Sequence, residues 1–143
     1  MKRRILVVDD DLAVLLTLKA VLEFHGFEVE TASSVAEALA RMKSAEYQMV
    51  ISDLRMETED AGLKVIHAAR RQSYDPATAL LTAFPPSGEH WEEDHSESLL
   101  IKPLGIKELL RQVEALLARH ADARQARLRT AAIATHDSAG KAG

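Results

Sequence analysis

Short apolar runs recur along the chain, and polar or turn-forming residues follow each of them. The runs that predict strands are residues 5–8, 27–31, 47–52, 78–81 and 99–101. Four of these runs are almost continuous in apolar residues at their centres, which is typical of parallel strands buried on both faces. Residues 27–31 instead alternate apolar and acidic residues, as expected of an edge strand with one face in water.

Apolar residues at helical spacing separate these runs and predict the helices between them. The residues that carry this spacing are Val14, Leu18, Val21 and Leu22 in the first helix, Leu39 and Met42 in the second, Leu63, Ile66 and Ala69 in the third, and Leu109, Leu110, Val113, Leu116 and Leu117 in the last. Gly26 suits the C-cap of the first helix. Ser34 and Glu37 form a capping-box pattern that opens the second helix, and the third helix is expected after Gly62.

The regular pattern fails in two places. Pro85 and Pro86 interrupt any helix that starts after the fourth strand, and residues 89–98 are almost all polar around Trp91, so we expect an irregular or short fourth helix. The last helix is predicted to continue toward Leu128, with a disordered end beyond it. The chain is therefore divided into one domain, residues 1–120, and a helix extension with a flexible C-terminal tail, residues 121–143.

Strands that alternate with helices predict an α/β fold with helices on both faces of a parallel sheet. The expected architecture is a flavodoxin-like, doubly wound, five-stranded sheet with strand order 2-1-3-4-5. In such sheets ligands bind beyond the carboxyl ends of the strands, where the strand order reverses. That point lies between the first and third strands, which end at Asp9, Asp10 and Asp53.

The residues at these strand ends suit a divalent cation and a phosphoryl group. Three carboxylates at one point repel one another, and Mg²⁺ prefers oxygen ligands of this kind. The central Asp53 could act as a nucleophile toward phosphorus, while Thr82 and Lys102 end the fourth and fifth strands and could contact phosphoryl oxygens. Any one of these aspartates alone could be a helix N-cap or turn residue, but the set in this order favours a site.

At these residues the chain resembles the receiver domain of two-component response regulators. The matching residues are Asp9 and Asp10 after the first strand, Asp53 after the third, Thr82-Ala83 after the fourth and Lys102-Pro103 after the fifth, over residues 3–120. The resemblance implies that Asp53 is the phospho-acceptor and that Thr82 and Lys102 sense the phosphoryl group. It also implies that Mg²⁺ binds Asp10 directly, Asp9 mainly through water, Asp53, and the backbone carbonyl of Arg55, and that the Lys102–Pro103 bond is cis.

Three features depart from the family pattern. Glu57 replaces a proline that usually follows the phospho-acceptor, and with Glu59 it is expected to add negative charge near the site. Leu99 occupies the position of a switch aromatic, so aromatic-coupled switching is not expected. The polar segment 85–97 replaces an ordinary fourth helix, on a face that often carries dimer or target contacts in relatives.

Composition narrows the possible functions. The chain has 143 residues, 47% of them hydrophobic, which suits a single domain with one core. A formal net charge of −4 gives no general reason to bind nucleic acid or a membrane. There is no cysteine, which excludes disulfides and thiolate chemistry. No apolar run is long enough for a membrane span, and the expected location is the cytoplasm.

The sequence therefore predicts a stand-alone, phospho-accepting receiver in a two-component phosphorelay rather than an enzyme. A sensor histidine kinase or a phosphotransfer protein would supply the phosphoryl group, a downstream protein would respond, and the chain would be a monomer or a weak homodimer. The alternative is a pseudo-receiver, an interaction module that works without phosphorylation. A phosphohydrolase on the same fold is disfavoured because no Gly-rich phosphate loop or nucleophile elbow is found.

Overall fold

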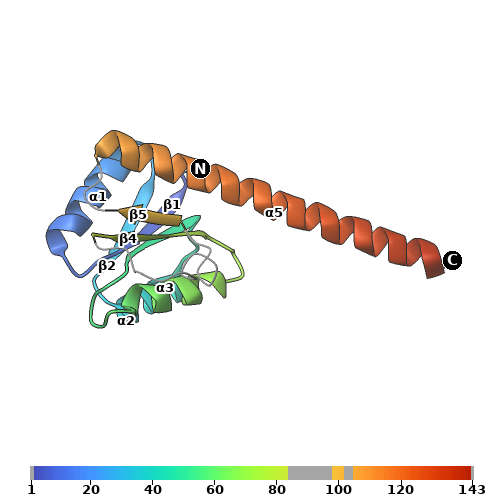
Figure 1. Ribbon diagram of the computed structural model, residues 1–143, viewed down its shortest axis with the longest axis horizontal. Helices are drawn as coiled ribbons and strands as arrows, with labels where there is room; N and C mark the ends of the chain where they lie inside the picture. Colours follow the sequence, from blue (N-terminus) through green and yellow to red (C-terminus); the bar gives the residue numbers. More distant parts are fainter. Residues whose placement is uncertain (1, 84–97, 102–104, 143) are drawn as a thin grey trace.

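The computed structural model describes residues 2–83, 98–101 and 105–142, with only the backbone described at 98, 99, 101 and 134–142. Five parallel strands form one sheet in the order β2-β1-β3-β4-β5, which confirms the predicted topology. Figure 1 shows this sheet with helices on both sides of it. The strands are β1 (Arg4–Val8), β2 (Glu28–Ala32), β3 (Met49–Asp53), β4 (Ala77–Thr82) and β5 (Ser98–Ile101). The acidic, alternating strand β2 lies at one edge, as its pattern predicts.

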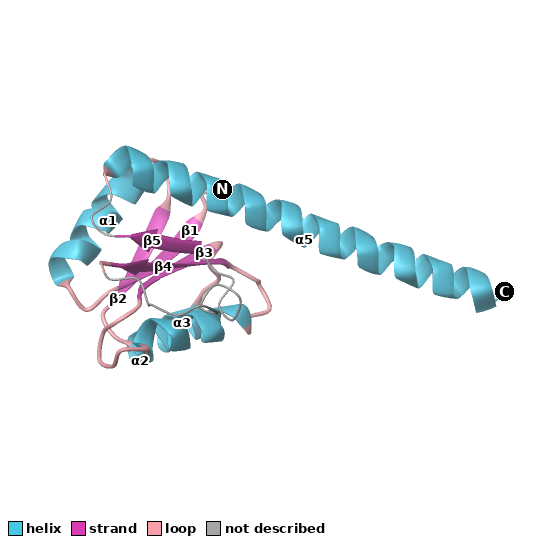
Figure 2. Cartoon of the chain, viewed as in Figure 1, coloured by secondary structure: helices cyan, strands magenta, loops and turns pink. Residues whose placement is uncertain are grey.

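Helices cover both faces of the sheet (Figure 2). One face carries α1 (Leu12–Phe24) and the start of α5 (Ile106–Ala142), and the other carries α2 (Val35–Ser44) and α3 (Ala61–Arg70). Alternate residues of β1 enter the two resulting cores, with Ile5 and Val7 on one side and Leu6 and Val8 on the other. Burial on both faces explains why the central strands are continuously apolar.

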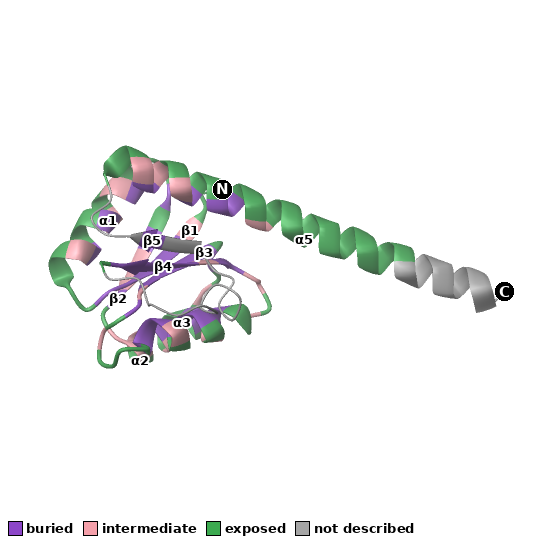
Figure 3. Cartoon of the chain, viewed as in Figure 1, coloured by how far each residue is buried: buried purple, intermediate pink, exposed green. Residues whose placement is uncertain are grey.

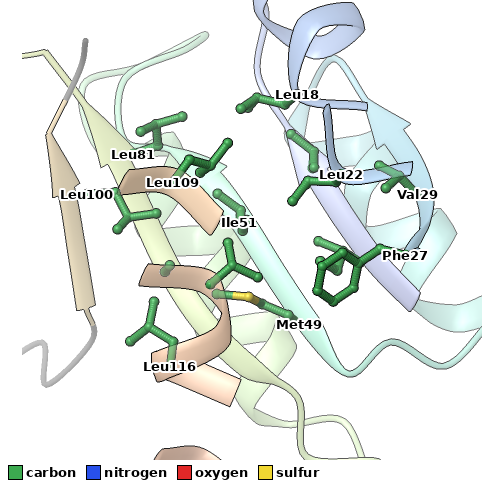
Figure 4. Close-up of a cluster of buried hydrophobic side chains, with 14 of the residues drawn as sticks. Leu18, Leu22, Phe27, Val29, Met49, Ile51, Leu81, Leu100, Leu109 and Leu116 are labelled. Atoms are coloured by element: carbon green, nitrogen blue, oxygen red, sulfur yellow. The ribbon is translucent and has the colours of Figure 1, made fainter. Parts of the chain in front are cut away.

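The core beneath α1 and α5 holds the larger set of buried side chains (Figure 4). Leu22 of α1, Ile51 of β3 and Leu109 of α5 approach one another from three elements, and the first two are at most 1% exposed. Burying a side chain of this size contributes about 1.5–3 kcal/mol. This shared core ties the first and last helices to the centre of the sheet, and so fixes the strand ends that carry the acidic residues.

The capping residues and glycines that the sequence predicts at helix ends lie at or close to those ends in the structure. Gly26 adopts φ of 94° directly after the C-cap of α1, a conformation that glycine favours. The Ser34 hydroxyl accepts the Glu37 backbone N–H at 3.1 Å. The Glu37 carboxylate accepts the backbone N–H of Ser33 at 3.1 Å, one residue before the position that a standard capping box uses. Helix α3 begins at Ala61, so Gly62 lies inside its first turn rather than before it.

Helix α5 is longer than the sequence predicts. It continues to Ala142, whereas the expected helix ended near Leu128, and its second half leaves the domain as a single rod (Figure 3). Ala and Arg are strong helix formers, which accounts for the continuation. Among the described side chains, Leu117 is the last buried one, and those of residues 121–133 are all exposed. The division at residue 120 and the flexibility of residues 121–143 stay predictions.

The predicted irregular or short fourth helix would fall in residues 85–97, which lie outside the described residues. The same holds for Lys102 and Pro103, and therefore for the expected cis bond between them. Leu99 pairs with Leu80 through the backbone of β5, but its side chain is not described, so the consequence of the missing aromatic stays a prediction.

Tyr47 joins the core to the edge strand β2. Its environment predicts that the free energy of unfolding depends on pH. Its side chain is buried and its hydroxyl donates a hydrogen bond to Glu30 of β2. Burial, helped by the Glu30 carboxylate, raises the pKa of the Tyr47 hydroxyl. The folded state therefore holds this proton more tightly than the unfolded chain does. Its contribution to stability is complete below the unfolded pKa of about 10 and falls as the pH rises further.

Urea unfolding between about pH 8 and 11 tests this dependence. The free energy of unfolding of the wild type is expected to fall above about pH 10, and Tyr47→Phe is expected to fall less over that interval. At neutral pH the variant should lose about 1 kcal/mol with the hydrogen bond. Equal alkaline slopes in both proteins would show that Tyr47 does not cause the loss.

Candidate functional site

The acidic residues meet at the carboxyl edge of the sheet, where β1 and β3 lie side by side. Val8 pairs with Ser52 across the two strands, so Asp9 and Asp53 follow at adjacent ends. One carboxylate oxygen each from Asp9, Asp10 and Asp53 lies within 4.8 Å of the other two. The structure thus brings together the three carboxylates that the sequence predicted at the switch point.

The three carboxylates differ in their access to solvent. Asp9 is 1% exposed, Asp53 is half-buried and Asp10 is exposed. The Asp9 carboxylate accepts the backbone N–H of Asp11 at 2.9 Å, and its own N–H donates to the Ala32 carbonyl at 3.1 Å, so this residue is held in place. An oxygen-only set with mutual repulsion fits a hard divalent cation such as Mg²⁺, which takes one or two carboxylates and keeps several waters.

Thr82 reaches the same edge from the neighbouring strand. Asp53 pairs with Leu81 across β3 and β4, which places Thr82 one residue further along. Its side chain is 2% exposed, so the hydroxyl lies beneath the surface beside the acidic cluster. Arg55 is exposed two residues after Asp53, and its carbonyl as a metal ligand stays a prediction. Lys102, the remaining predicted site residue, lies outside the described residues.

Gly62 packs closely against the end of β3, the strand that carries Asp53. The sequence analysis did not assign Gly62 to the site. Its backbone N–H donates to the Leu54 carbonyl at 2.8 Å. A Cβ at this position would lie 2.1 Å from the Asp53 carbonyl oxygen and 2.6 Å from the Leu54 Cα. The first turn of α3 therefore packs directly on the backbone that carries Asp53. An isolated glycine at the start of a helical pattern is the signal that could have indicated this close approach.

Glu57 makes a contact that the sequence analysis did not predict, while its effect on charge near the site stays a prediction. Its carboxylate accepts the backbone N–H of Val35, the first residue of α2, at 3.0 Å. A carboxylate at a helix N-terminus satisfies an unpaired N–H and complements the helix dipole. The loop that follows Asp53 is thereby joined to α2.

Removing this contact should destabilise the protein modestly. We expect Glu57→Ala to lower the free energy of unfolding by about 0.5–1 kcal/mol, the usual cost of losing a helix cap. Glu59→Ala is the matched control, since Glu59 is exposed and has no hydrogen bond or ion pair among the described residues. Urea unfolding of both variants makes the comparison, and equal losses would mean that the Glu57 contact contributes nothing.

Comparisons with known proteins agree with this geometry. The family model of the response regulator receiver domain matches residues 5–114. The transcriptional regulatory protein PrrA of Mycobacterium leprae is 36% identical over 118 residues, 81% of this chain and 50% of that protein. The response regulator MprA of Mycolicibacterium vanbaalenii is 37% identical over 118 residues, 81% of this chain and 51% of that protein. The chain spans about half the length of these curated relatives.

Solved structures show the same likeness. The chemotaxis protein CheY4 of Vibrio cholerae is 27% identical with a TM-score of 0.71, covering 81% of this chain and 99% of that one. The response regulator TrrA of Thermotoga maritima, solved in complex with Mg²⁺ and BeF, is 34% identical with a TM-score of 0.66, covering 80% and 98%. The doubly wound sheet, the carboxylate cluster at its switch point and these matches together define one class of protein, the receiver domain. The chain belongs to the response regulator receiver domain family of two-component systems.

No helix in the described part of the chain is both long enough and apolar enough to cross a membrane.

Proposed function

We propose that this receiver accepts a phosphoryl group on Asp53. A carboxylate oxygen of Asp53 attacks phosphorus in a phosphohistidine donor, the O–P bond forms, the P–N bond breaks, and the imidazole leaves and takes up a proton. The observation that carries the proposal is the convergence of Asp53 with Asp9 and Asp10 within 4.8 Å, with Asp53 half-buried at the open edge of the sheet.

The surrounding residues have distinct parts in this proposal. Asp9 and Asp10, with Asp53 and the carbonyl of Arg55, would hold Mg²⁺, which when bound neutralises charge on the transferred phosphoryl oxygens. The Thr82 hydroxyl would donate to one of these oxygens once the group is attached. Lys102 would pair with another, as the resemblance implies.

Phosphorylation adds about −1.5 to −2 charges at one sheet edge, which would bias the loops there and change a surface that a partner protein contacts. We expect a sensor histidine kinase or a phosphotransfer protein as donor and a downstream protein as target, in the cytoplasm. The match covers only about half of each curated relative, so the regulatory activity of those proteins belongs to their whole chains. The role of this chain beyond accepting a phosphoryl group is therefore part of the proposal.

Fluoroberyllate tests the site without a cognate kinase, because it occupies the place of a phosphoryl group on a carboxylate. With Mg²⁺ present, beryllium fluoride should raise the melting temperature of the wild type by several degrees, since a ligand that binds only the folded state stabilises it. Asp53→Asn and addition of EDTA should each abolish the rise. A rise that persists in Asp53→Asn, or no rise although Mg²⁺ binds, would instead support the pseudo-receiver.

A further inference from the structure

A cavity lies at the amino-terminal end of strand β4, on the side of the sheet opposite the carboxyl ends that carry Asp53. It has a volume of about 600 Å³ and is bounded by the start of β4, the end of α3 and the middle of α5. Strand β4 runs from Ala77 at this cavity to Thr82 at the acidic site. Five residue steps of roughly 3.3 Å separate these two ends, so the cavity is spatially distinct from the acidic site.

Positive side chains dominate the polar lining of this cavity. Arg119 and Arg127 come from α5, Arg70 comes from α3, and His120 adds an imidazole ring. Among the described residues that line the cavity, Asp75 is the only one with a carboxylate. The chain as a whole carries a formal net charge of −4, so this concentration of arginines runs against the overall charge and favours an anion locally.

The contacts of the lining residues differ, and Arg119 is the arginine without a partner among the described residues. Asp75 accepts a hydrogen bond from Arg127 at 2.8 Å, and its backbone carbonyl lies 2.8 Å from the His120 Nε2. Arg119, in contrast, has no hydrogen bond or ion pair among the described residues. Arg119 and Arg127 are eight residues apart on one helix, about 12 Å along its axis, and both line the same cavity.

We propose that this cavity binds a phosphorylated small molecule that carries at least two phosphate charges, such as a nucleotide polyphosphate. The guanidinium group presents paired N–H donors that match phosphate oxygens, which favours arginine wherever phosphate is recognised. The volume lies within the range of about 300–1,000 Å³ that small-molecule sites occupy, which favours a small ligand over an extended macromolecule. The two arginine-bearing walls are separate helices, so the ligand would bridge α3 and α5.

A ligand that bridges α3 and α5 would restrain the direction in which the exposed part of α5 leaves the domain. Asp75, His120 and Arg127 already join the loop before β4 to α5 where that helix leaves the domain. An anion held between Arg70 and Arg119 would add a second connection beside the first. The ligand would therefore restrain the exposed part of α5 without touching the phospho-acceptor edge.

Calorimetric titration of the full chain with pyrophosphate and with ATP tests the proposal, in EDTA so that the acidic site holds no metal. We expect saturable binding of both probes and no binding of adenosine. Arg119→Glu should weaken both at least tenfold. Arg129→Glu is the matched control, because it makes the same charge change on the same helix and does not line the cavity. Asp53→Asn should bind as the wild type does, which separates this result from the proposed phospho-acceptance.

Four outcomes would overturn the proposal: no saturable binding of pyrophosphate, equal weakening by both arginine variants, binding of adenosine as tight as that of ATP, or tighter binding of single-stranded DNA than of pyrophosphate and ATP. Equal weakening would show attraction to the helix charge in general. A single-stranded DNA oligonucleotide is titrated in parallel. Tighter binding of this DNA than of pyrophosphate and ATP would assign the arginines to a surface that binds a macromolecule.

Discussion

Gly62→Ala is expected to destabilise the receiver by about 3 kcal/mol, near the upper end of the range for overpacking. Intrinsic helix propensity alone favours alanine over glycine by about 1 kcal/mol, so a simple helix argument gives the opposite sign. The steric term dominates because the new Cβ would lie 2.1 Å from the Asp53 carbonyl oxygen, and backbone atoms of a central strand cannot move aside cheaply. Urea unfolding measures the loss.

The same substitution should also damage the site. Relieving the clash must push α3 away from the backbone of Asp53 and Leu54, so the stabilisation by Mg²⁺ and beryllium fluoride should shrink even where the variant remains folded. Gly105→Ala is the control, since a Cβ there meets no atom of the described residues within 4 Å, and we expect a loss of at most about 1 kcal/mol, the usual cost of replacing a favourable residue directly before a helix. A Gly62 variant as stable as the Gly105 variant would contradict the close packing of α3 on this strand.

The effect of Asp10→Asn on the free energy of unfolding should change sign when Mg²⁺ is added. Without the cation, removing one of three carboxylates that approach within 4.8 Å relieves repulsion, and the free energy of unfolding should rise by about 1 kcal/mol. With the cation at about a hundred times its dissociation constant, the wild type gains about 2.7 kcal/mol and the variant should gain little. The variant is therefore more stable than the wild type in EDTA and less stable in Mg²⁺.

Asp11→Asn provides a matched control for this reversal of relative stability between EDTA and Mg²⁺. Asp11 is the neighbouring exposed aspartate and caps α1 by accepting the Ala13 N–H at 2.9 Å, a role that asparagine also fills. It carries the same charge change but is not one of the three clustered residues. The Mg²⁺ effect should survive in this variant, and its loss in both variants would mean that net charge, rather than the site, controls the response.

The strand order and the acidic cluster were predictable because each depends on short-range patterns. Continuous apolar runs identify strands buried on both faces, and Asp9 and Asp53 follow two of those runs directly. Parallel strands place all their carboxyl ends at one edge, so side chains distant in sequence become neighbours without any knowledge of packing. The observed pairing of Val8 with Ser52 brings these two aspartates together in this way.

The remaining features depend on contacts that a sequence pattern does not encode. The approach of Gly62 to Asp53 is a distance between a helix and a strand end, and a glycine in a helical pattern has several explanations. The Glu57 carboxylate bonds to Val35, 22 residues away, through a loop whose path no local signal fixes. The length of α5 was underestimated because helix propensity continues through residues that no core packing supports.

The most direct measurement of phospho-acceptance is the intact mass of the chain after incubation with acetyl phosphate and Mg²⁺, followed by peptide mapping of the modified residue. We expect one added phosphoryl group on the peptide that contains Asp53, absent in EDTA and absent in Asp53→Asn. A phosphoryl group on another residue, or none in a protein that binds Mg²⁺ at the acidic cluster, would contradict Asp53 as the phospho-acceptor.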